Sequence, residues 1–139
     1  MAIVYFDSSA FVKLLIDEEG SDVAAALWDG CDAAVSSRLA YPEVLAALAA
    51  AGRARRLGAD EQLQAQSLWE EFWAATRAVE LTEDIAHQAG QLAAAHALRG
   101  ADAVHLASVL AIDGAVFAVW DQRLRAAGRE TAARLAPSQ

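Results

Sequence analysis

Short apolar runs alternate with longer segments of helical period along this chain, and this alternation limits the possible fold more than any other feature. The runs are short and apolar enough for buried strands. They cover residues 3–6, 33–35, 79–81 and 115–120. Strands that alternate with helices are typical of α/β folds, in which helices cover both faces of a mostly parallel sheet. The sequence therefore predicts an α/β fold.

The segments between these runs begin with residues that are common at helix starts. Ser21 and Asp60 are preferred N-cap residues, Pro42 suits a first helical turn, and Thr82 with Glu83 opens a further helix. The predicted helices cover residues 9–16, 21–28, 42–51, 60–73, 83–96, 101–112 and 122–127. Residues 135–139 give no clear signal. No repeat or linker divides the sequence, so we expect one domain over residues 1–139.

Composition excludes several classes of protein. Hydrophobic residues make up 56% of the chain and charged residues 22%, which excludes a disordered chain. No apolar stretch reaches the roughly 18 residues of a membrane span, and no basic segment precedes the first apolar run as in a secretory signal. Cys31 is the only cysteine, so an internal disulfide and a cysteine-based zinc site are excluded. We expect a cytoplasmic protein.

The net charge of −8 argues against a general nucleic-acid coat protein, which would carry a basic face. It is compatible with an enzyme that handles a phosphate backbone through metal ions. A metal site needs an excess of carboxylates, and part of the negative charge fits such a site.

Four acidic residues stand where predicted strands end or predicted helices begin. They are Asp7, Glu43, Asp102 and Asp121. Each one alone is explained as a helix N-terminal acid, which capping and the helix dipole stabilise. The carboxyl ends of parallel strands and the N-termini of the helices meet at one edge of a sheet, so we expect the four to converge.

Converging carboxylates require a compensating charge. Two of them about 4 Å apart repel each other by about 4 kcal/mol at an effective dielectric near 20. A hard divalent cation relieves that repulsion, and oxygen-only ligands without a His or Cys cluster point to Mg²⁺ or Mn²⁺.

The stretches "FDSSAFVKL", "RLAYPEVLAAL", "ADAVHLASVL" and "VWDQRL" together resemble the PIN-domain ribonucleases, and most closely the VapC-type toxins of bacterial toxin–antitoxin modules. The resemblance extends from Ile3 to about Gly128. It implies a PIN-like three-layer α/β/α fold with a central, mostly parallel sheet of four to five strands. It also implies a Mg²⁺-dependent endoribonuclease that acts on RNA, forms a homodimer or a hetero-oligomer with its antitoxin, and has no membrane partner.

The resemblance also implies roles for individual residues. Asp7, Glu43, Asp102 and Asp121 match the catalytic acids of the family. Asp7 and Asp102 would hold the metal, and the other two would complete the cluster, directly or through water. Ser8 matches a hydroxyl that helps to hold a water or a phosphate.

Three other residues near the acids have weaker signals. Arg99 and Arg123 are placed in the sequence to meet an RNA substrate, although a surface role is as compatible with their positions. Val119 stands where the family often has Thr or Ser, so a hydroxyl is missing two residues before Asp121. His105, one turn after Asp102, is interpreted as a packed or hydrogen-bonded helix residue rather than as a ligand.

The alternative function is a catalytically silent PIN-like module that binds RNA or protein. A phosphatase of the haloacid dehalogenase type would need a second acid at Ser9, and a response-regulator receiver would need a late Lys, whereas the only one is Lys13. The complete acidic set favours the nuclease.

Overall fold

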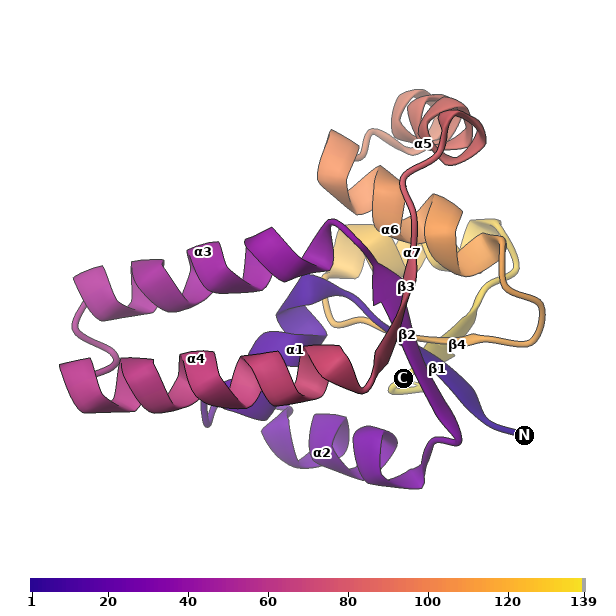
Figure 1. Ribbon diagram of the computed structural model, residues 1–139. Coiled ribbons are helices and arrows are strands. Elements are labelled where there is room, and N and C mark those ends of the chain that lie inside the picture. The colour runs from indigo at the N-terminus through magenta and orange to yellow at the C-terminus, as the bar shows by residue number, and fades with distance from the viewer. Residues whose placement is uncertain (139) are drawn as a thin grey trace.

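The computed structural model describes residues 1–138 and places a five-stranded sheet between two layers of helices (Figure 1). The strands are β1 (Ile3–Phe6), β2 (Ala33–Ser37), β3 (Thr76–Val79), β4 (Val116–Ala118) and β5 (Arg134–Ala136). Their order is β3-β2-β1-β4-β5, and all neighbouring pairs are parallel. The predicted three-layer α/β/α fold is confirmed.

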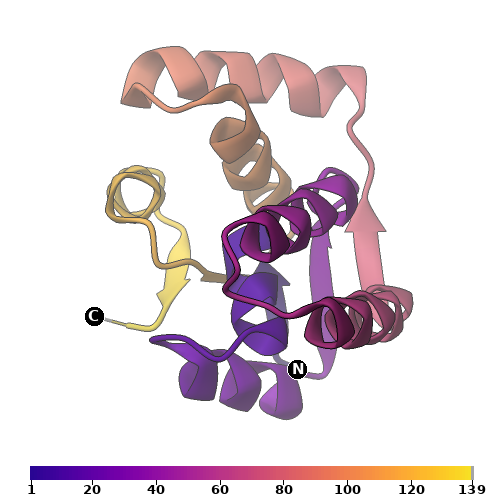
Figure 2. The same ribbon diagram turned by 90° about the vertical axis from the view of Figure 1, so that its left-hand side faces the viewer.

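Seven helices connect the strands within residues 1–138. They are α1 (Ser8–Leu15), α2 (Ser21–Gly30), α3 (Ala40–Arg53), α4 (Ala59–Ala74), α5 (Glu83–His96), α6 (Gly100–Leu110) and α7 (Gln122–Glu130). In both views α5 lies at one extreme of the molecule and α2 at the other (Figures 1 and 2). No helix in the described residues is both long and apolar enough to cross a bilayer.

Successive side chains of β1 enter different cores, as the period of two in a strand requires. Tyr5 packs in the core under α5, α6 and α7, together with residues such as Leu106 and Phe117. Val4 and Phe6 pack in the core under α1, α3 and α4, which also contains Trp69. Because β1 is the central strand, the residue that follows it emerges at the middle of the sheet edge.

The observed strands differ from the prediction mainly in β3 and β5, while β2 extends to Ser37 and β4 covers only Val116–Ala118. The third strand is β3, which ends at Val79 opposite Ser37, and Leu81 lies beyond it at 50% exposure. The prediction placed the strand too late because Leu81 is apolar without being buried. β5 was missed altogether, because a three-residue edge strand has too short a pattern to detect.

The starts or caps of several helices also differ from the prediction. α3 begins at Ala40, so Pro42 lies in its first turn, where a missing N–H removes no helical hydrogen bond. Glycines, rather than Ser21 and Asp60, occupy the N-cap positions of α2 and α4. The Ser21 hydroxyl instead binds the preceding loop, where it accepts from the Glu18 N–H at 2.9 Å.

Candidate active site

Asp7 is the first residue after β1 and the N-cap of α1. Its Oδ1 atom accepts hydrogen bonds from the Ala10 N–H and the Ser9 hydroxyl, both at 2.9 Å. The residue is only 5% exposed. The central strand and the start of α1 therefore hold this carboxylate at a fixed place on the sheet edge.

The surroundings of Asp7 disfavour its negative charge. Burial raises the pKa of its carboxyl group above the usual value, and the nearby charge of Asp102 raises it further. His105 and the hydrogen bonds from Ala10 and Ser9 act in the opposite direction without outweighing burial. Both hydrogen-bond donors are neutral, so a cation at this place would stabilise the carboxylate.

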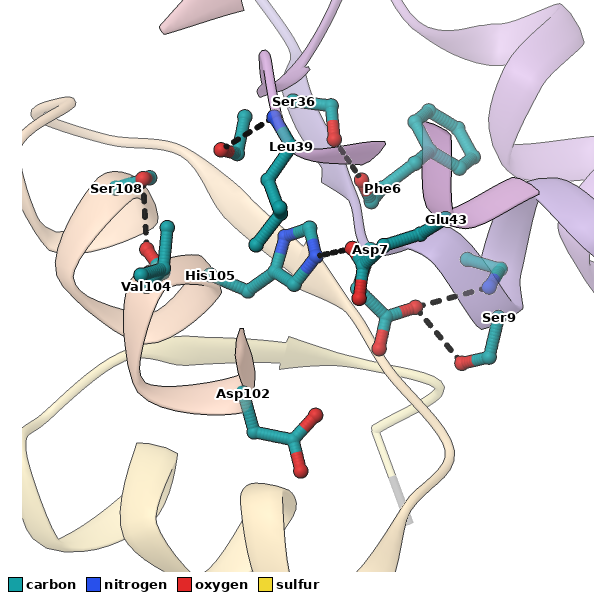
Figure 3. Close-up of polar contacts among 12 residues, drawn as sticks. Phe6, Asp7, Ser9, Ser36, Leu39, Glu43, Asp102, Val104, His105 and Ser108 are labelled. Atoms are coloured by element: carbon teal, nitrogen blue, oxygen red, sulfur yellow. Dashed lines mark hydrogen bonds and ion pairs between the residues drawn. The ribbon is translucent and has the colours of Figure 1, made fainter. Parts of the chain in front are cut away.

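Glu43 lies in the first turn of α3 and is held by a histidine. Its Oε1 atom is 2.7 Å from Nε2 of His105, which projects from α6. Figure 3 shows the His105 ring directed toward the carboxylates of Glu43 and Asp7. The interpretation of His105 as a buried, hydrogen-bonded residue agrees with its 1% exposure.

Asp102 lies in the first turn of α6 and pairs with Arg99. The two atoms, Oδ2 of Asp102 and Nε of Arg99, are 3.1 Å apart. Asp102 raises the pKa of Arg99 most strongly, and Asp121 and Glu43 add to the effect. Since three carboxylates act on one guanidinium and Asp102 also acts on Asp7, the four acids surround one region.

Asp121 follows β4 and is the N-cap of α7, where its Oδ1 accepts from the Leu124 N–H at 2.9 Å. It is exposed, unlike Asp7. The side chain of Val119 is fully buried in the core under α7, and its carbonyl accepts from Arg125 at 2.7 Å. A hydroxyl at position 119 would therefore lie in an apolar core.

The remaining predicted residues lie at the rim. Ser8 is the first residue of α1, but the hydroxyl that binds Asp7 belongs to Ser9. The stretch "DSS" offered both serines, and only the helical turn decides between them. Arg123 is exposed and contacts the Ala97 carbonyl at 3.4 Å.

The four acids lie at one edge of the sheet, but their side chains do not converge on a single point. Within residues 1–138, no three His, Cys, Asp or Glu side chains are placed to hold one metal ion. Glu43, Asp102 and Asp121 instead bind His105, Arg99 and the Leu124 N–H respectively. The donor set consists of carboxylate oxygens around a buried, charge-disfavoured Asp7, and these properties fit a hard divalent cation.

The chain is similar to known proteins over nearly its whole length. The family model described as "PIN domain" matches residues 4–130. Two curated proteins of Mycobacterium tuberculosis, named Ribonuclease VapC45 and Ribonuclease VapC49, are each 62% identical to this chain over 141 residues, covering 100% of it and 98% of the relative.

Solved structures show the same fold at lower identity. M. tuberculosis VapC20, described as a sarcin–ricin loop cleaving toxin, superposes with a TM-score of 0.69 at 21% identity and covers 91% of this chain and 95% of its own. VapBC2 from Rickettsia felis, solved with a promoter DNA fragment, gives a TM-score of 0.67 at 12% identity, with 96% of each chain covered.

Proposed function

The chain belongs to the PIN-domain family and its near relatives are named VapC ribonucleases, and from this we propose that it is a metal-dependent endoribonuclease and the toxin of a toxin–antitoxin pair. The preferred ion is Mg²⁺, with Mn²⁺ as a substitute. The observation that carries the proposal is Asp7, a buried carboxylate with a raised pKa beside the charge of Asp102. A cation beside such a group stabilises its ionised form.

The acids have different tasks in this proposal. Asp7 and Asp102 bind the ion, and Glu43 and Asp121 complete the site directly or through water. Both hydrogen bonds of Asp7 go to Oδ1, so Oδ2 is the oxygen available to an ion. A bound Mg²⁺ supplies a water of lowered pKa and neutralises charge on the scissile phosphate.

The reaction is the hydrolysis of a phosphodiester bond. Water attacks the phosphorus in line, the bond to the 3′-oxygen breaks, and that oxygen leaves with a proton. The products are a 5′-phosphate end and a 3′-hydroxyl end. Arg99, 83% exposed in its side chain and next to three of the acids, is placed to bind a backbone phosphate, with Arg123 and Ser8 at the rim.

The central test replaces Asp7 by Asn. We expect Asp7→Asn to abolish Mg²⁺-dependent cleavage of RNA, measured on a labelled oligonucleotide or total RNA, because the amide removes the charge that binds the ion. The amide oxygen still accepts the hydrogen bonds from Ala10 and Ser9, so the fold remains. The matched control is Asp113→Asn, an exposed residue before β4 that lies far from the carboxyl ends of the strands.

A titration distinguishes the nuclease from a catalytically silent module. We expect Mg²⁺ and Mn²⁺ to bind at millimolar concentration or below to the unmodified protein and to Asp113→Asn, but not to Asp7→Asn. Absence of binding to the unmodified protein, or unchanged cleavage by Asp7→Asn, would contradict the proposal.

Partners follow from the same family relation. We propose that the chain forms a homodimer and binds an antitoxin protein, as the paired name VapBC of one structural neighbour suggests. Light scattering of the protein alone tests the dimer.

A further inference from the structure

A chain of hydrogen bonds connects the centre of the sheet to the candidate site through His105. The phenol oxygen of Tyr5 is 2.7 Å from Nδ1 of His105, and Nε2 of His105 is 2.7 Å from Oε1 of Glu43. Tyr5 is 0% exposed and His105 1%, and their rings meet edge to face at 5.8 Å. β1, α6 and α3 each supply one member, so residues far apart in sequence hold both nitrogens of one ring.

The contact with Glu43 determines which nitrogen of the His105 ring carries a proton. An ionised Glu43 can only accept a hydrogen bond, so Nε2 of His105 is the donor in that contact. In a neutral imidazole the other nitrogen, Nδ1, is then an acceptor and needs a donor of its own.

The phenol of Tyr5 supplies that donor. Burial raises the pKa of Tyr5 far above its usual value, so its O–H remains protonated. The hydroxyls of Ser36 and Ser108, which lie beside the phenol, donate to backbone carbonyls at 2.6 and 2.7 Å. Neither serine hydroxyl therefore has a proton to donate to Nδ1. If Tyr5 donates its O–H to Nδ1 and His105 donates its Nε2–H to Glu43, each of these polar groups has a hydrogen-bond partner.

We propose that His105 is a positioning residue that holds Glu43 in the geometry needed for the ion, with Nε2 bound to Glu43 and Nδ1 bound to the Tyr5 hydroxyl. This inference rests on the proposed function. A free glutamate side chain samples several rotamers, whereas this one is anchored at Oε1, which leaves Oε2 for the ion or its water.

Three variants test the role. His105→Ala removes the anchor, and Tyr5→Phe removes only the donor to Nδ1. In His105→Gln, the amide oxygen can accept from Tyr5 while the NH₂ donates to Glu43. His87→Ala, which changes an exposed histidine on α5, is the control.

The first readout needs neither metal nor RNA. The nitrogen chemical shifts of the His105 ring in the metal-free protein report the tautomer. We expect the Nε2–H form in the unmodified protein and in His87→Ala, and a mixture of tautomers in Tyr5→Phe. A ring protonated at Nδ1 alone would overturn the assignment.

The second readout is Mn²⁺ affinity, followed by the electron paramagnetic resonance signal, with cleavage kinetics beside it. We expect His105→Ala to bind Mn²⁺ at least tenfold more weakly and to lower kcat about as much, with KM for RNA changed less than twofold. His105→Gln should recover most of both losses. If His105→Ala does not fold, the comparison of Tyr5→Phe with His105→Gln replaces it.

Two failures remain distinguishable. A folded His105→Ala, or Tyr5→Phe in its place, with unchanged Mn²⁺ affinity and kcat overturns the positioning role alone. An unmodified protein that binds no divalent cation overturns the proposed function.

Discussion

Asp7 combines two roles in one side chain. As an N-cap it binds the Ala10 N–H through Oδ1, and as a candidate ligand it offers a carboxylate at the end of the central strand. The capping interpretation from sequence and the metal interpretation are therefore compatible for this residue. Burial makes its charge unfavourable in the metal-free protein.

The raised pKa of Asp7 predicts a pH-dependent stability. Between the ordinary pKa of Asp, about 4, and its higher value in the folded protein, the folded state keeps a proton that the unfolded state has lost. The stability that this group contributes is thus present at low pH and is lost as the pH rises through that interval. Asp7→Asn cannot titrate, so in EDTA its melting temperature should exceed that of the unmodified protein by more at pH 7 than at pH 4.

The comparison within one pair of proteins cancels the titration of all other groups. Thermal unfolding monitored by circular dichroism across this range is the measurement. A variant that is less stable by the same amount at every pH would contradict the raised pKa.

For single residues, the sequence predicts where a functional side chain stands along the chain better than it predicts which side chains it contacts. The acids could be located because each follows a strand or opens a helix, which is a local pattern. The contacts of His105 with Tyr5 and Glu43 span 100 and 62 residues, and no local pattern contains them. The choice of Ser9 over Ser8 as the partner of Asp7 likewise depends on the direction of the first turn of α1.

The joint between α1 and α2 depends on a glycine. Gly20 has a φ of +90°, and a Cβ atom there would lie 2.8 Å from Nε1 of Trp120. Lys13 covers the Trp120 ring, with its Nζ 5.2 Å from the centroid. Since Trp120 precedes Asp121, this joint also supports one side of the candidate site.

We expect Gly20→Ala to lower the free energy of unfolding by about 1–3 kcal/mol, because the left-handed backbone and the contact with Trp120 both oppose a methyl group. Urea denaturation measures the change. The control is Gly30→Ala at the end of α2, where nothing lies within 4 Å of the added carbon. That control should be neutral or stabilising by up to about 1 kcal/mol. Equal effects at both positions would contradict the explanation.

Among the elements, those with long or strongly apolar patterns were predictable, whereas the edge strand β3 was predicted too late in the chain and the edge strand β5 was missed. β1 is recognisable because it is buried on both faces, as a central parallel strand must be. β3 and β5 lie at the edges of the sheet, where half-exposed residues such as Thr76 and Leu135 give no distinctive pattern. Their places follow from the pairing partners β2 and β4, which are known only in the folded molecule.

Across the whole molecule, a buried arginine connects the late elements of the chain. Arg125 on α7 is 2% exposed and donates to the carbonyls of Val119 at 2.7 Å and Pro137 at 2.6 Å. It thereby joins α7, the end of β4 and the segment after β5. The sequence gives no sign of this, because an arginine in a short helix is usually exposed.

We expect Arg125→Met to lower the free energy of unfolding by about 2–4 kcal/mol, since it leaves two carbonyls without their donor. Arg129→Met, on an exposed position of the same helix, should change it by less than about 0.5 kcal/mol. Chemical denaturation of both variants measures the difference. A similar small effect at both positions would show that the buried guanidinium is dispensable.

The caps at Asp7 and Asp121 have an evolutionary consequence. Each binds its helix through Oδ1 alone, and an asparagine oxygen can do the same, so the fold tolerates the loss of either charge. Aspartate and asparagine codons differ by one base. Under the proposed function, a cell harmed by this protein has, at each of these positions, a single-base route to an inactive but intact form. Such a form would keep its surface and compete with the active protein for the same partners.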